Sequence, residues 1–129
     1  HVGDSRVYRL RHGSLERLTL DHSWVEEQVR SGALSAAMAE QHPWRNIVTQ
    51  ALSGDNDVEV DISEVLLETG DRLLLCSDGL FAVLGDEDIE RLLGLEGPLQ
   101  QVCDVLVKEV NRGGGPDNVT VLVMEIDVT

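Results

Sequence analysis

Three aspartates stand where short extended segments begin or end, and they are the residues best suited to chemistry in this chain. Asp78 follows the apolar run from Arg72 to Cys76 and directly precedes Gly79. A carboxylate at the end of a buried strand is held in place by the core, and an adjacent glycine permits close approach of backbone, ligand or ion. Asp78 is therefore a candidate metal ligand.

Asp117 has the matching context, because it stands just before an apolar run from Val119 to Ile126. In an antiparallel pair the end of one strand lies beside the start of its neighbour, so Asp78 and Asp117 are expected at one edge of a sheet, and Asp4 could join them. Clustered carboxylates suit magnesium or manganese, which prefer oxygen ligands. Each aspartate alone is also explained as a turn residue that bonds its own backbone, and spacing leaves this alternative open.

The elements that must position these acids are predicted from apolar periodicity. Residues 72–76 lack polar alternation, which predicts a strand covered on both faces. Alternating segments on either side of His12-Gly13 predict a hairpin. Further strands are expected at residues 49–52, 55–68 and 119–126.

Capping residues and apolar spacings predict the helices. Ser23 can cap a helix over residues 24–30, and Ser35 a second over residues 36–40. Gly85-Asp86 begins a helix of about eight residues, by its acidic first turn. From Pro98 to Arg112, apolar residues recur at three and four spacings, which predicts the longest helix.

Composition excludes several classes of function. The chain has 129 residues, a formal charge of -14 and few aromatic side chains, so it is expected to form one domain and not to bind nucleic acid. No run approaches membrane-spanning length and no leader is visible, so a cytoplasmic location is expected. Cys76 and Cys103 lack the spacing of a zinc site and are expected to be buried thiols without a disulfide.

Five motifs occur in an order that is similar to the C-terminal half of bacterial type 2C, metal-dependent (PPM-type) protein serine/threonine phosphatases. The match covers nearly the whole chain. The motifs are His1-Val-Gly-Asp-Ser-Arg-Val-Tyr8, Leu18-Thr-Leu-Asp-His-Ser23, His42-Pro-Trp-Arg-Asn46, Cys76-Ser-Asp-Gly-Leu80 and Gly115-Pro-Asp-Asn-Val-Thr-Val121.

The resemblance implies a fold and a site. The fold is α+β, part of an α/β/β/α sandwich of antiparallel sheets flanked by helices, with residues 20–54 matching a flap-like region beside the active site. Asp78 and Asp117 match acids of a two-ion Mn²⁺ or Mg²⁺ centre, and Asp4 matches an acid that helps to hold a third ion in bacterial members. The implied reaction is hydrolysis of phosphoserine and phosphothreonine in protein substrates by a metal-activated water.

The chain lacks several residues that the family uses for catalysis. The N-terminal half of the family supplies an acid, a phosphate-gripping arginine and a histidine proposed as general acid, and Arg6, Arg9 and Arg45 do not replace that arginine by motif. We therefore expect these 129 residues to be inactive by themselves and to self-associate through uncovered sheet surfaces. Two other readings stay open: a non-catalytic phosphatase-like binding or regulatory module, and an unrelated acidic interaction domain.

Overall fold

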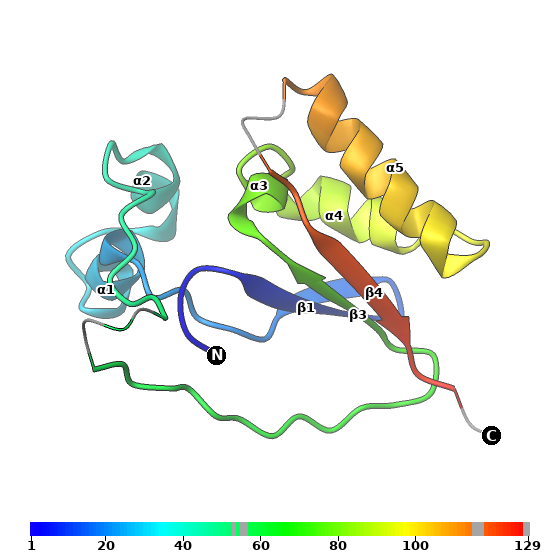
Figure 1. Ribbon diagram of the computed structural model, residues 1–129, viewed down its shortest axis with the longest axis horizontal. Coiled ribbons are helices and arrows are strands. Elements are labelled where there is room, and N and C mark those ends of the chain that lie inside the picture. Colours follow the sequence, from blue (N-terminus) through cyan, green and yellow to red (C-terminus); the bar gives the residue numbers. More distant parts are fainter. Residues whose placement is uncertain (53, 55–56, 115–117, 128–129) are drawn as a thin grey trace. The chain divides into compact units, whose positions relative to one another are not determined.

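The computed structural model describes residues 1–52, 54, 57–114 and 118–127. The chain divides into two compact units (Figure 1). The first unit comprises residues 1–4 and 20–64, and the second comprises residues 5–19 and 65–129.

The second unit is built on a four-stranded antiparallel sheet in the order β2-β1-β3-β4. The predicted hairpin is confirmed: His12 and Gly13, at φ 50° and 75°, both adopt the left-handed conformation that a two-residue hairpin turn requires. The central strand is confirmed at its predicted bounds. The strands are β1 (Arg6–Arg11), β2 (Ser14–Arg17), β3 (Arg72–Cys76) and β4 (Val121–Glu125).

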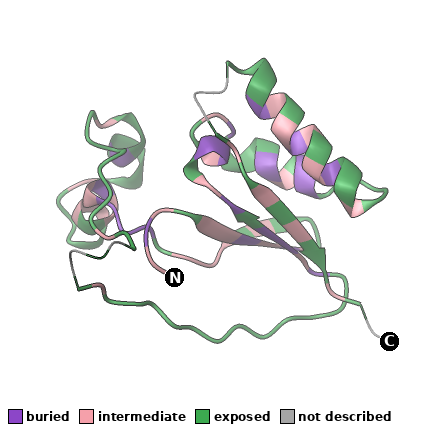
Figure 2. Cartoon of the chain, viewed as in Figure 1, coloured by how far each residue is buried: buried purple, intermediate pink, exposed green. Residues whose placement is uncertain are grey.

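Helices α4 (Asp86–Leu93) and α5 (Leu99–Arg112) cover one face of this sheet, while the short α3 (Asp78–Phe81) follows β3 directly (Figure 1). Both longer helices are confirmed, although Pro98 precedes α5 as its N-cap rather than beginning it. Figure 2 shows that α4 and α5 are buried on one side and exposed on the other. The buried residues of these helices, the sheet and the segment after β3 form one core, which consists of Tyr8, Leu10, Leu74, Cys76, Leu80, Leu84, Ile89, Leu92, Leu93, Val102, Leu106 and Val110.

The other face of the sheet carries exposed apolar side chains. Leu75 and Leu122 are paired across β3 and β4, and are 37% and 49% exposed; Met124 is 41% exposed. The prediction that both faces of β3 are covered is therefore wrong at Leu75, whereas Leu73, on the same face of β3, is buried at 8% exposed. A continuous apolar run indicates that both faces avoid water, but it does not require that the same chain supplies both covers.

An ion pair that the sequence did not reveal anchors the start of β3. Asp71 is 1% exposed. Its carboxylate accepts hydrogen bonds from Arg11 Nε (2.9 Å) and Nη2 (2.7 Å), and from the main-chain N–H of Glu68 (2.8 Å). The Arg11 guanidinium, more than the Glu68 N–H, holds the pKa of Asp71 well below its ordinary value, against the opposing effect of burial.

The first unit contains two short helices, α1 (Trp24–Arg30) and α2 (Ala36–Gln41). Both predicted caps are confirmed, because the Ser23 and Ser35 side chains accept hydrogen bonds from the main-chain N–H groups of Glu26 and Met38. The Trp24 ring lies 4.9 Å from the rings of both His42 and Trp44, centroid to centroid. The two tryptophans and His42 therefore form one aromatic group in the first unit.

Two predicted strands are wrong within the described residues. Residues 49–52 form no strand, and only Val48 makes an isolated bridge, to Ser23. Residues 57–68 are not paired in a ladder and are almost all exposed, with Ile62 and Leu66 at 89% and 91%, so they do not have the one covered face that was predicted. Alternation predicts a strand's side-chain pattern, but a strand forms only where a neighbour accepts its hydrogen bonds.

The fold is α+β with an antiparallel sheet, as predicted. Among the described residues, no helix is long and apolar enough to cross a membrane.

Candidate metal centre

Asp78 lies at the junction of β3 and α3. Cys76, the last residue of β3, is 4% exposed, whereas Asp78, two residues later, is exposed as the first residue of α3. The Asp78 main-chain carbonyl accepts a hydrogen bond from the Ala82 N–H at 2.9 Å. A rigid, buried strand thus presents this carboxylate to solvent, which is the arrangement that the sequence predicted.

The start of β4 is fastened to the same junction. Ser77 N–H donates to the Thr120 carbonyl at 3.1 Å, and Ser77 Oγ accepts from the Thr120 N–H at 3.0 Å. The structure shows why a glycine follows Asp78. A Cβ at Gly79 would lie 2.1 Å from the Asn118 carbonyl oxygen. The neighbour that approaches Gly79 is therefore the backbone of Asn118, and only glycine leaves room for it.

The other two candidate ligands are less directly described. Asp117 lies outside the described residues, although Asn118, the next residue, is held against Gly79. Asp4 is half-buried and belongs to the first compact unit, whereas Asp78 belongs to the second. The three assignments remain predictions.

The three arginines considered at sequence level are engaged locally. Arg6 Nη1 donates to the Tyr8 hydroxyl at 2.9 Å, and its guanidinium carbon lies 3.7 Å from the Phe81 ring centroid. Arg9 pairs with Glu16. Arg45 donates to the His42 carbonyl at 3.0 Å. Each of these arginines therefore makes a contact within its own part of the chain.

The prediction of a buried thiol is confirmed for Cys76 but not for Cys103, which is only partly buried. Cys76 is buried in the core, Cys103 is half-buried on α5, and neither forms a disulfide. Cys76 lies two positions from Asp78, but its burial among apolar side chains fits a packing role.

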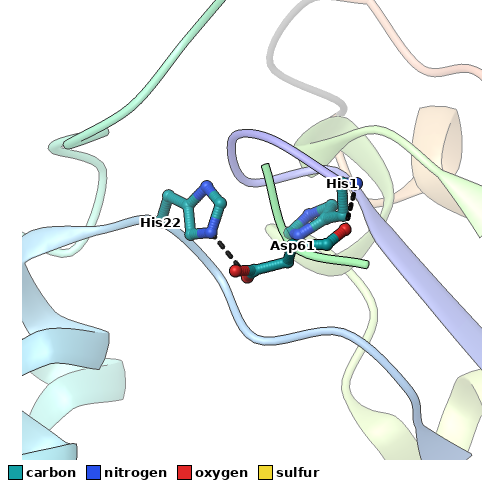
Figure 3. Close-up of side chains that lie close together, drawn as sticks. All are labelled: His1, His22 and Asp61. Atoms are coloured by element: carbon teal, nitrogen blue, oxygen red, sulfur yellow. Dashed lines mark hydrogen bonds and ion pairs between the residues drawn. The ribbon is translucent and has the colours of Figure 1, made fainter. Parts of the chain in front are cut away.

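One cluster was missed by sequence reasoning. His1, His22 and Asp61 each place one nitrogen or oxygen atom within 4.8 Å of the others (Figure 3). His22 and Asp61 are separated by 39 positions, and no short motif links them. Only the fold of the first unit reveals that they meet.

Comparison with known proteins identifies the family. A family model described as Stage II sporulation protein E (SpoIIE) matches residues 32–127. The serine/threonine phosphatase stp of Listeria monocytogenes is 43% identical over 129 residues, which are 100% of this chain and 51% of that protein.

Solved structures agree with the sequence match. The Mycobacterium tuberculosis serine/threonine phosphatase PstP/Ppp superposes with a TM-score of 0.94 at 39% identity, over 99% of this chain and 54% of that one. A PstP catalytic domain in complex with two manganese ions superposes with a TM-score of 0.85 at 34% identity, over 99% of this chain and 52% of that one.

These matches and the fold place the molecule in a defined class. The chain belongs to the bacterial PPM-type protein serine/threonine phosphatases, and it spans about half the length of the relatives that it matches.

Proposed function

We propose that these 129 residues form the C-terminal part of the catalytic domain of a phosphatase that hydrolyses phosphoserine and phosphothreonine in proteins. The observation that carries the proposal is the exposed Asp78 carboxylate at the end of β3, in a chain that matches metal-dependent phosphatases along its length. The proposed substrates are phosphorylated proteins, and the proposed role is in signalling.

The residues present fit a hard cation. Asp78 offers carboxylate oxygens, which magnesium and manganese prefer. The close contact between Gly79 and Asn118 brings the start of β4 to the end of β3, and Asp117 directly precedes Asn118 in the sequence. We assign Asp78 and Asp117 to a two-ion Mn²⁺ or Mg²⁺ centre, and Asp4 to a third ion.

The chemistry follows from the donor set. Two bound ions would lower the pKa of a coordinated water molecule and would stabilise negative charge that develops on phosphoryl oxygens. The contribution of the chain is rigidity: β3 is hydrogen-bonded on both sides, and Ser77 ties its end to Thr120, so the Asp78 main chain is fixed before any ion binds.

The test is a substitution in the full-length protein. Asp78→Ala should lower manganese-dependent hydrolysis of p-nitrophenyl phosphate by more than about 100-fold, because even groups that only orient a metal ligand typically contribute 10–100-fold. The matched control is Asp104→Ala, which removes an exposed carboxylate from α5 and should keep activity. Activity retained in Asp78→Ala would contradict the ligand assignment.

A protein that consists of the 129 residues alone belongs in the same experiment. We expect no manganese-dependent turnover, because the family's acid, arginine and histidine have no counterpart by motif in these residues. Turnover by this piece would contradict that expectation. If the full-length protein binds manganese but shows no turnover, the alternative of a non-catalytic binding or regulatory module is favoured.

A further inference from the structure

His1, His22 and Asp61 form a cluster that is not part of the proposed set of metal ligands. His22 is 4% exposed, and its two ring nitrogens point to different partners. Figure 3 shows the His22 ring directed at the Asp61 carboxylate, and the His1 and His22 rings lie 5.0 Å apart, centroid to centroid.

Two histidines and a carboxylate are also a common ligand set for zinc and similar ions, so this use must be weighed first. His22 Nδ1 accepts a hydrogen bond from the Gly3 N–H at 3.0 Å, which places the proton of a neutral ring on Nε2. That proton is donated to Asp61 Oδ2 at 2.7 Å. An ion on Nε2 would move the proton to Nδ1, where it would face the Gly3 N–H, so the bonds favour a positioning role.

What His22 holds is the peptide of Gly3. Besides the bond to its ring, the His22 main-chain N–H donates to the Gly3 carbonyl at 2.8 Å. Both polar groups of Gly3 are therefore bound by one residue. Gly3 is buried and has φ +103°, a conformation that side chains other than glycine's rarely adopt. This conformation sets the direction in which the chain enters Asp4.

Asp61 completes the arrangement from the other side. His1 and Asp61 exchange two main-chain hydrogen bonds, His1 N to Asp61 O at 2.8 Å and Asp61 N to His1 O at 2.9 Å. The carboxylate that fixes the His22 tautomer is thus tied to the segment that His22 holds. The His22 carbonyl accepts from the Thr49 N–H at 2.8 Å, which fixes the His22 main chain as well.

We propose that His22 is a positioning residue for Asp4: its ring, held in one tautomer by Asp61, fixes the Gly3 peptide and so orients the Asp4 carboxylate for a cation. The inference rests on the proposed role of Asp4. Groups that orient a metal ligand typically change metal affinity by 10–100-fold when they are removed.

The test is manganese binding to the full-length protein, measured by calorimetry without substrate. Asp4→Ala first identifies the ion that depends on Asp4. His22→Gln keeps a donor near Asp61 but removes the acceptor for Gly3, and should weaken binding of that same ion by about 10-fold. His22→Asn places an oxygen near the Nδ1 position, so it should keep the acceptor for Gly3 and lose clearly less affinity than His22→Gln.

The outcomes distinguish the role of His22 from the role of Asp4. Asp4-dependent binding that is unaffected by His22→Gln overturns the positioning role but keeps the ligand assignment. Manganese binding that Asp4→Ala leaves unchanged overturns both. Equal losses of affinity in His22→Gln and His22→Asn would show a general structural role and also overturn the inference.

A second variant covers the case in which His22→Gln does not fold. The Asp61 side chain is 55% exposed, so Asp61→Asn should be tolerated by the fold. It removes the charge that holds the tautomer, and the affinity for the Asp4-dependent ion should fall several-fold. Unchanged affinity in Asp61→Asn would then overturn the proposal.

Discussion

At the residue scale, the buried carboxylate of Asp71 makes a testable contribution to stability. Its pKa is lowered chiefly by the hydrogen bonds from Arg11, so the folded state favours the ionised form. The stabilisation is therefore complete above the ordinary pKa of an aspartate, about 3.9, and is lost as the pH falls below it towards the folded-state pKa.

The prediction concerns Asp71→Asn in the full-length protein. The variant should have a lower melting temperature at pH 7, because Arg11 loses its buried anionic partner and keeps only the more exposed Glu68. Its melting temperature should fall less than that of the wild type between about pH 5 and pH 3. Circular dichroism melts across this range measure both effects. Asp104→Asn, at an exposed position, should keep the wild-type slope; the same slope in Asp71→Asn would contradict the assignment.

At the element scale, the junction of β3, α3 and β4 depends on the absence of a side chain at Gly79. A Cβ at that position would lie 2.1 Å from the Asn118 carbonyl oxygen, and a backbone atom cannot move aside as a flexible side chain can. The contact therefore couples the start of α3 to the segment that leads into β4.

Gly79→Ala in the full-length protein should lower the free energy of unfolding by about 1–3 kcal/mol, the usual cost of overpacking. If Asp78 and Asp117 are metal ligands as proposed, it should also weaken manganese binding, because a Cβ at this position pushes the segment leading into β4 away from α3. Urea denaturation and calorimetry measure the two effects. Gly54→Ala is the control, since nothing lies within 4 Å of a Cβ there. Wild-type stability and binding in Gly79→Ala would show that the contact is unimportant.

At the scale of the whole molecule, helices α4 and α5 cover one face of the sheet, whereas the other face is only partly covered: Leu73 is buried there but its neighbours are exposed. This partly covered face carries Leu75, Leu122 and Met124. Apolar side chains gathered on a sheet face favour association. In a protein that consists of the 129 residues alone, we therefore expect self-association through this face.

Analytical ultracentrifugation of that protein at increasing concentration measures the effect. Leu122→Glu should shift the molecule towards monomer, because a buried charge without a partner opposes association. Gln101→Glu adds the same charge at an exposed position of α5 and should associate like the wild type. A compact monomer at high concentration in the unsubstituted protein would refute the expectation.

Local signals in the sequence were sufficient for most elements. The caps of α1 and α2, the turn at His12-Gly13 and the apolar spacing of α5 act within a few residues, so they predicted these elements closely. The sequence by itself also placed Asp78 at the end of a buried strand, because the pattern that buries residues 72–76 stops at that point.

Only the tertiary structure decided what depends on distant partners. Residues 57–68 alternate like a strand, yet no ladder forms there among the described residues, because pairing needs a neighbour that local sequence does not specify. In the same way, nothing near Asp71 in the sequence shows that its carboxylate pairs with Arg11. Nor does the local sequence show that the His22 ring bonds to Gly3 and Asp61. Sequence fixes the local backbone preferences, whereas hydrogen bonds between segments many residues apart exist only once the chain has folded.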